Sequence, residues 1–170
     1  MLKFLGALML FCGCVGVGLM QVNQMDKRMK TLQALICGLE IMDRELSFRI
    51  PLLGEILSTA GRSTEGAVRK FFSACGDELN KNLDNPFRDL WNRAAHKHLT
   101  ALKKSDLEPV LALGSVLGRY DGEGQRKAIG QTHNALTQAL SNAAVERSSQ
   151  GKVYTVLGTT AGAFLLILLL

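Results

Sequence analysis

The chain has 170 residues, enough for one domain of ordinary size, with 20 basic and 15 acidic side chains. Their distribution is uneven: residues 4–25 and 153–170 carry no charge, whereas residues 25–152 hold 19 of the 20 basic and all 15 acidic side chains. The sequence is therefore a polar stretch of 128 residues between two apolar ends. This layout excludes a simple soluble cytosolic enzyme and a secreted disulfide scaffold.

The two apolar ends are long enough to be membrane-spanning helices, since about 20 apolar residues cross a hydrocarbon core of about 30 Å. Residues 4–22 meet that length, and residues 153–170 lie at the short end of the range and close on a Leu-rich run. We therefore predict transmembrane helices in residues 1–24 and 153–170. Residues 25–152 between them are predicted to form a cytoplasmic helical bundle.

The cytoplasmic location follows from the basic residues close to the two spans. The domain side of the spans carries Lys27, Arg28, Lys30, Arg147 and Lys152, against a single lysine on the outer side, Lys3. A cleaved signal peptide and a lipoprotein signal around Cys12 and Cys14 remain open as alternatives for the N-terminus. In the second span, Gly158 and Gly162 have the spacing that lets two membrane helices pack closely.

Apolar residues recur at spacings of three and four through the central stretch, which predicts amphipathic helices. The first helix continues out of the first span to about Phe48, and a short second helix runs from Pro51 through Leu57 and is closed by Gly61. The third and sixth helices follow from the stripes Val68, Phe71, Phe72, Cys75, Leu79 and Ile129, His133, Leu136, Leu140, Ala144. The sixth helix is expected to run into the second span.

The fourth and fifth helices are predicted from their starting signals. Asn85 is the expected N-cap of the fourth helix, and Ser105 with Glu108 has the capping-box spacing for the fifth. No alternating strand pattern is present. The predicted fold class is all-α, a membrane-anchored bundle of about six helices between two transmembrane helices.

The fifth helix is unusual because no charge occurs from Pro109 to Gly118. A helix that is apolar on all sides is expected to be buried, either in the centre of the bundle or under a partner. This helix and the loop after it are therefore the two surfaces that we single out for protein binding.

No catalytic or metal-binding pattern is present. The four cysteines, Cys12, Cys14, Cys37 and Cys75, lack paired spacing and are expected to be buried free thiols. His96 and His98 point in different directions from a helix, and His133 lies on an apolar stripe. We predict that the chain is not an enzyme, has no metal, cofactor or small-molecule substrate, and binds no nucleic acid.

The segment from Gly61 to Gly66 has the glycine spacing of a phosphate-binding loop. Ala67 and Val68 stand where such a loop needs a lysine and a hydroxyl residue, and no strand precedes it. We therefore interpret this segment as a turn between two helices.

Several short motifs, in this order, resemble the family of stage III sporulation protein AB. They are Met1–Ala7, Pro51–Leu52, Leu102–Glu108, Leu113–Gly114, Leu117–Gly118, Asp121, Gln125, Ile129 and the Leu-rich end. The resemblance implies that the soluble part is similar to the cytoplasmic domain of the inner-membrane platform protein of type II secretion and type IV pilus systems, a six-helix bundle.

The resemblance also implies a function. It places the chain in the mother-cell membrane, as a structural component of the channel complex between mother cell and forespore. The implied partners are a secretion-type ATPase and the other membrane proteins of that complex. The residues that we assign to a partner interface are Gly114, Leu117, Gly118, Arg119, Asp121 and Gln125.

Two functions are carried forward from the sequence. The first is a platform that docks the ATPase to the membrane complex. The alternative is a membrane-anchored lipid- or ligand-binding regulator without catalysis, in which the fifth helix lines a pocket.

Overall fold

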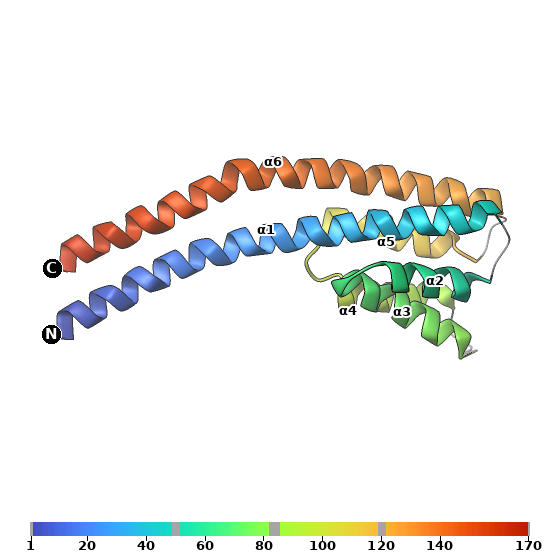
Figure 1. The fold of residues 1–170 in the computed structure, drawn as a ribbon, viewed down its shortest axis with the longest axis horizontal. Helices are drawn as coiled ribbons and strands as arrows, with labels where there is room; N and C mark the ends of the chain where they lie inside the picture. Colours follow the sequence, from blue (N-terminus) through green and yellow to red (C-terminus); the bar gives the residue numbers. More distant parts are fainter. Residues whose placement is uncertain (1, 49–51, 82–85, 119–121, 170) are drawn as a thin grey trace. The chain divides into compact units, whose positions relative to one another are not determined.

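The computed structural model describes the backbone of residues 2–48, 52–81, 86–118 and 122–169. Beyond residues 20–149, only a few side chains belong to the described part. The described residues form six helices and no strand, which confirms the predicted all-α class (Figure 1). The helices are α1 (Leu2–Phe48), α2 (Leu53–Ser63), α3 (Gly66–Asn80), α4 (Phe87–His98), α5 (Lys104–Val116) and α6 (Gly122–Leu169).

The chain divides into two compact units. One unit is the helical bundle, residues 30–141, and the other consists of the two ends, residues 1–29 and 142–170. Helices α1 and α6 each contribute to both units without a break. The predicted continuity of the first and sixth helices with the apolar ends is therefore confirmed as helical backbone.

For the two apolar ends, the structure describes the helical backbone but only a few side chains. In the described part of the chain, no helix is long and apolar enough to cross a membrane, so the two predicted transmembrane helices find no support there. The side chains of residues 4–15 and 161–169, on which these two predictions mainly depend, lie outside the described residues.

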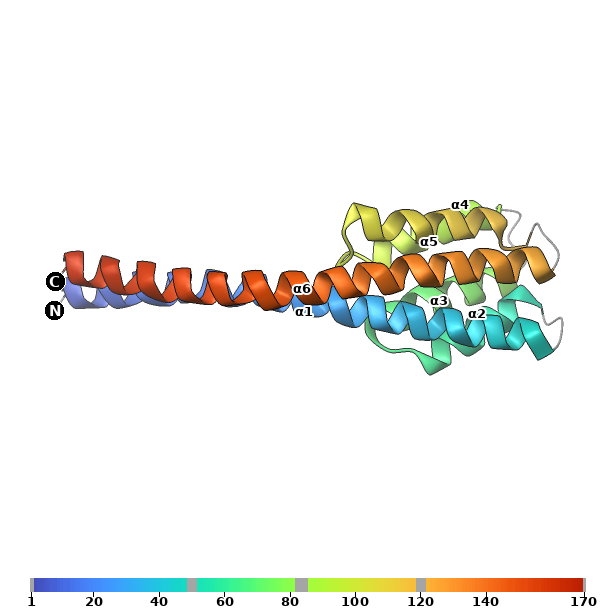
Figure 2. The ribbon, with the colours of Figure 1, turned by 90° about the horizontal axis from the view of Figure 1, so that it is seen from above.

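Within the unit of the two ends, α1 and α6 run antiparallel and side by side (Figures 1 and 2). Two ion pairs connect them: Arg28 Nη1 lies 2.8 Å from Glu146 Oε2, and Arg147 Nε lies 2.9 Å from Asp26 Oδ1. The hydrogen bond to Asp26 and the charge of its carboxylate raise the pKa of Arg147. These pairs hold the two helices together close to the point where the apolar stretches begin.

The core of the bundle collects one face from each helix. On α1 this face consists of Leu32, Leu35, Leu39 and Met42, and on α6 of Ile129, Thr132 and Leu136. On α6 the predicted stripe is shifted slightly, since His133 and Leu140 are half-buried and Ala144 is exposed. The shift arises because the partner helices, and not the period alone, decide which side of a helix faces inward.

Helices α2 and α3 approach each other closely through small residues. A Cβ atom added to Gly61 would lie 2.7 Å from Ser73 Oγ, and one added to Gly76 would lie 2.9 Å from Ser58 Oγ. Gly61 therefore does not close the second helix, as predicted, but lies buried inside it. The helix ends at Ser63, and Pro51, its predicted start, lies outside the described residues.

Helix α5 begins earlier than predicted. It starts at Lys104, and the carboxylate of the buried residue Asp106 accepts a hydrogen bond from the backbone N–H of Lys103 at 3.1 Å. The predicted capping pair of Ser105 and Glu108 is therefore wrong. The corresponding N-cap prediction for α4, Asn85, lies outside the described residues, and Pro86 occupies the cap position.

Of the two positions predicted for α5, the centre of the bundle is wrong, and burial under a partner stays a prediction. Val110, Leu113 and Gly114 are buried, whereas Leu111 is half-buried and Ala112 is exposed. An apolar composition therefore does not place this helix in the centre of the bundle.

Candidate functional site

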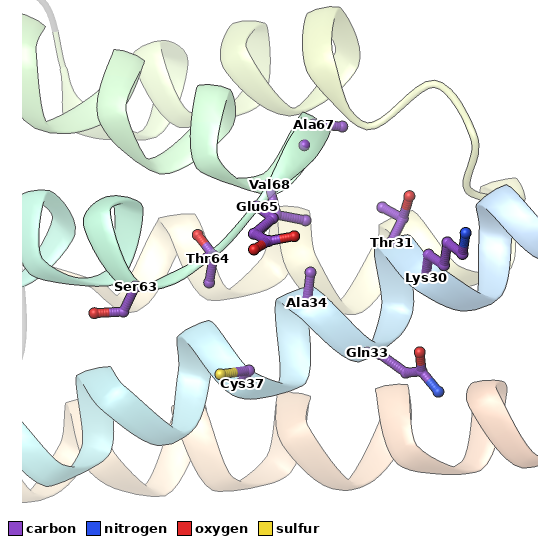
Figure 3. Close-up of a pocket in the computed structure, with 11 residues that line it drawn as sticks. Lys30, Thr31, Gln33, Ala34, Cys37, Ser63, Thr64, Glu65, Ala67 and Val68 are labelled. Atoms are coloured by element: carbon purple, nitrogen blue, oxygen red, sulfur yellow. The ribbon is translucent and has the colours of Figure 1, made fainter.

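The bundle carries a groove of about 530 Å³ between α1 and the turn that joins α2 to α3 (Figure 3). Its lining residues are Lys30, Thr31, Gln33, Ala34 and Cys37 from α1, and Ser63, Thr64, Glu65, Gly66, Ala67 and Val68 from the turn and the start of α3. All of these residues belong to the bundle unit.

The turn wall of the groove is held in place by its own hydrogen bonds. The Thr64 hydroxyl, in a residue only 3 % exposed, donates to the Ala60 carbonyl at 2.8 Å, and Arg69 Nε donates to the Thr64 carbonyl at 2.8 Å. Gly66 has φ +60°, a left-handed conformation that glycine adopts without the cost other residues incur. The predicted turn between two helices is therefore confirmed for Thr64 and Glu65, whereas Gly61 to Ser63 belong to α2 and Gly66 begins α3.

The α1 wall presents side chains of mixed character. Thr31 and Ala34 point toward the turn, whereas Gln33 points away from it (Figure 3). Lys30 and Glu65 supply one charge of each sign at the rim, and the Cys37 thiol is exposed. Such a lining suits an amphipathic segment of a protein or lipid better than a strongly charged small molecule.

Chemistry beyond binding has no support in this groove. Its lining residues include no histidine, and the only carboxylate is that of Glu65. Among the described residues, no group of three histidines, cysteines or carboxylates could hold a metal ion. What the groove provides is a shape and a mixed surface, which are features of a binding site.

Four of the six predicted partner-interface residues lie in the described part of the chain. Gly114 and Leu117 are buried, and Gly118 is exposed with φ +79° at the end of α5. Gln125 is half-buried in the first turns of α6. Arg119 and Asp121 lie outside the described residues, so the interface as a whole stays a prediction.

Gly114 has a clear role inside the bundle. A Cβ atom added there would lie 2.9 Å from Trp91 Nε1 and closer still to the neighbouring ring carbons. The glycine lets α5 approach the indole of α4, whose N–H donates to the Val110 carbonyl at 2.7 Å. The predicted membrane-packing residues Gly158 and Gly162 lie in the helical backbone of α6, and their surroundings are outside the described residues.

The cysteines differ from the expectation of buried thiols. Cys75 is buried in α3, and burial, with a smaller contribution from Glu78, raises its pKa to about 12. Cys37, in contrast, is exposed, so for this residue the prediction is wrong. Cys12 and Cys14 lie outside the described side chains.

The histidines are likewise dispersed. His133 Nε2 lies 3.3 Å from Glu40 Oε1 at a partly exposed position between α6 and α1, so it is not a core residue. His98 is half-buried, and desolvation, followed by the charges of Lys97 and Lys70, lowers its pKa.

Sequence reasoning examined one wall of the groove but did not recognise it as part of a site. The sequence predicts a turn and not a phosphate-binding loop for the segment from Gly61 to Gly66, and the α1 residues carry no motif at all. The polar residues that interrupt the α1 stripe, such as Lys30 and Gln33, mark the face of α1 that leaves the core. They are the only signal that could have indicated an open surface.

The fold and the groove define a class, an all-helical bundle with an open groove beside α1. Within this class, the chain belongs to the stage III sporulation protein AB family, whose model matches residues 3–170. It is 26 % identical over 172 residues to stage III sporulation protein AB of Bacillus subtilis (strain 168), with full coverage of both chains. A role in sporulation is therefore implied.

A solved structure supports the fold. The chain is similar to a structure of stage III sporulation protein AB with a TM-score of 0.65 and 23 % identity, over 72 % of this chain and 98 % of that one. At this identity the similarity establishes the shared fold, and the family assignment rests on the sequence match.

Proposed function

We propose that this protein is a structural, membrane-anchored platform of the sporulation channel complex between mother cell and forespore. In this proposal, its helical bundle lies in the cytoplasm of the mother cell and docks a secretion-type ATPase. The observation that carries the proposal is the continuity of α1 and α6, which leave the bundle as uninterrupted helices and enter the two apolar ends.

The ion pairs between the two ends support this role. A platform that transmits force or position between an ATPase and a membrane needs its anchors held together. The contacts of Arg28 with Glu146 and of Arg147 with Asp26 join the two helices at this level. The basic residues nearby also suit a cytoplasmic location at a membrane with anionic lipids.

The choice of an ATPase as partner rests on the similarity that we infer to platform domains of type II secretion and type IV pilus systems. The loop between α5 and α6 is the surface we assign to it. Exposed Gly118 ends α5 there, and Gln125 lies in the first turns of α6.

Docking is tested by capture of the cognate ATPase on the full chain in a mild detergent. We expect the wild type and the K104E variant, which changes an exposed lysine near the start of α5, to capture the ATPase equally. The R119E variant should reduce capture at least about tenfold, since a reversed charge at an interface both removes an attraction and adds a repulsion. Equal capture by both variants would show that the α5–α6 loop is not the docking surface, and no capture by the wild type would rule out direct docking.

Topology is tested separately, by protease protection of the bundle in inside-out and right-side-out vesicles. We expect cleavage only when the cytoplasmic face is accessible. Cleavage only from the opposite face would exclude contact with a cytoplasmic ATPase.

The groove favours a second candidate function, binding of a lipid or another amphipathic ligand by a regulator. Its lining comes from α1 and the α2–α3 turn, and not from α5 as the sequence suggested. Mass spectrometry of the purified full chain under native conditions should detect a bound lipid if this function is correct. Absence of bound lipid, together with no affinity for anionic vesicles, would leave the platform as the remaining proposal.

A further inference from the structure

A second groove, of about 240 Å³, lies between α3 and α4 and differs from the first in its charge. Its lining residues are Ala74 and Glu78 from α3, and Leu90, Arg93, Ala94, Lys97 and His98 from α4. The α4 residues lie three, four, seven and eight positions after Leu90, so they occupy a single face of that helix. The groove is therefore a regular channel between two helices.

The floor and the rim of this groove have different chemistry. The floor is apolar, and little of its surface is accessible, because Leu90 and Ala94 are each 6 % exposed and Ala74 is half-buried. The rim is basic on its α4 side, where Arg93 and Lys97 are exposed.

The basic rim continues onto α3. Lys70 lies one helical turn before Ala74, and its charge acts on His98 across the groove. The single carboxylate at the rim, Glu78, lies 3.8 Å from Arg93 across the groove. The side chains of this pair are 63 % and 44 % exposed for Arg93 and Glu78, so a partner can reach both groups.

We propose that the α3–α4 groove binds an acidic amphipathic helix of a partner protein, whose apolar side chain lies on the Leu90–Ala94 floor and whose carboxylates pair with Arg93 and Lys97. Helices with one apolar face commonly bind in grooves of this kind. The inference is independent of ATPase docking, because it concerns a different surface and specifies the chemistry of the partner and not its identity.

Charge complementarity decides between a protein segment and a nucleic acid. Three cations, Lys70, Arg93 and Lys97, surround the groove, and a polyanion of any kind would be attracted to them. The Glu78 carboxylate would repel a continuous line of phosphates, whereas a protein segment can place a basic residue against it. A phosphate backbone also has no apolar group that could contact the apolar floor.

The basic residues also have a possible structural role that the test must separate. Lys97 and His98 lie in the last turn of α4, where positive charge stabilises a helix end. Variants that only lower the stability of the bundle would reflect this role and not binding.

Binding is measured by fluorescence anisotropy with the full chain in a mild detergent. The probe is a labelled 16-residue peptide with Leu and Glu at helical spacing, and its matched control carries Lys in place of each Glu. We expect the acidic peptide to bind, and its affinity to fall about tenfold in the R93E/K97E variant, because two attractions become repulsions. The K104E/K127E variant, which makes the same change of charge at exposed lysines of α5 and α6, should bind as the wild type does.

The milder R93Q/K97Q variant keeps the test valid if charge reversal perturbs the fold. A second readout is the pKa of His98, followed by NMR of the chain with labelled histidines. The carboxylates of a bound peptide should raise this pKa, because they oppose the lowering effect of Lys97 and Lys70. Glu78 and Arg93 also line the groove beside His98. The pKa values of His96 and His133 serve as internal references.

Three results would overturn the proposal. They are no binding of the acidic peptide by the wild type, equal loss of binding in K104E/K127E, and tighter binding of a single-stranded oligonucleotide of equal charge that is lost in R93E/K97E. The last result would identify the groove as a nucleic-acid site.

Discussion

At the scale of single residues, Trp91 lies at the centre of the contacts between α3, α4 and α5. It is 1 % exposed, its ring centroid lies 4.6 Å from that of Phe71 in an edge arrangement, and its indole N–H donates to the Val110 carbonyl. Because this donor is buried, the hydrogen bond fixes how α5 lies against α4. Gly114 is the residue that leaves room for the ring.

We expect the G114V substitution to destabilise the bundle by about 1–3 kcal/mol, because the added side chain would overlap the indole. The chain has one tryptophan, so denaturant unfolding followed by its fluorescence reports directly on this part of the core. The matched control is G130A, at an exposed glycine of α6 with nothing within 4 Å of the added Cβ. It should be neutral or stabilising by up to about 1 kcal/mol through helix propensity. Equal stability of G114V and wild type would show that the indole can move aside.

The two described thiols are expected to react differently. At pH 8, Cys37 should be labelled by a maleimide in the native chain, whereas Cys75, with a pKa of about 12, should be labelled only after unfolding. Peptide mapping by mass spectrometry distinguishes the two sites from Cys12 and Cys14. Equal labelling rates for Cys37 and Cys75 in the folded chain would contradict the burial of Cys75.

The raised pKa of Cys75 also predicts a pH dependence of stability. Between 9.0, its ordinary value, and about 12, the unfolded thiol loses its proton while the folded thiol keeps it. The folded state then binds more protons, so the free energy of unfolding falls as the pH rises through this range. In the C75A variant, the free energy of unfolding should therefore fall less between pH 8 and pH 10 than it does in the wild type, as measured by urea unfolding at both pH values.

At the scale of elements, the α2–α3 pair includes a close approach at the glycines Gly61 and Gly76. We expect G61A to destabilise the bundle by about 1–3 kcal/mol, because the new methyl group would lie 2.7 Å from Ser73 Oγ and 3.1 Å from the Ser73 backbone nitrogen. Removing the hydroxyl in G61A/S73A should recover part of the loss. Thermal unfolding of the wild type, G61A, S73A and G61A/S73A gives the coupling free energy between the two positions. Additive effects of the two substitutions would disprove the contact.

At the scale of the whole molecule, the two ends form a paired structure, and one of their ion pairs is less exposed than the His133–Glu40 pair of the bundle. The side chains of Arg28 and Glu146 are 11 % and 26 % exposed, whereas those of His133 and Glu40 are 31 % and 55 % exposed. The E146Q variant should therefore lower stability by about 1–2 kcal/mol, because the partly buried guanidinium loses the charge that compensates it. The matched E40Q variant should change stability by less than about 0.5 kcal/mol. Circular dichroism melts at low ionic strength measure both, and equal effects would show that burial is unimportant at Arg28.

Much of the helical layout was predictable, because helix periodicity and helix ends depend on neighbouring residues. The stripe through Phe71, Phe72 and Cys75 placed α3 correctly, and the continuity of the first and last helices was anticipated. The roles of Gly61 and Gly114 were not predictable. A glycine that ends a helix and one that allows close packing are identical in the sequence, and only the side chain opposite distinguishes them.

The sequence by itself determined that this protein is all-helical, that its charges are confined to a central stretch, and that its ends are apolar. These are properties of composition and of contacts within one or two helical turns. Only the tertiary structure decided that α5 is buried on one face, that Cys37 is exposed, and that two grooves lie beside α3. The physical reason is that each of these features depends on residues that are far apart in the chain, such as Cys37 and Thr64, and that packing brings them together.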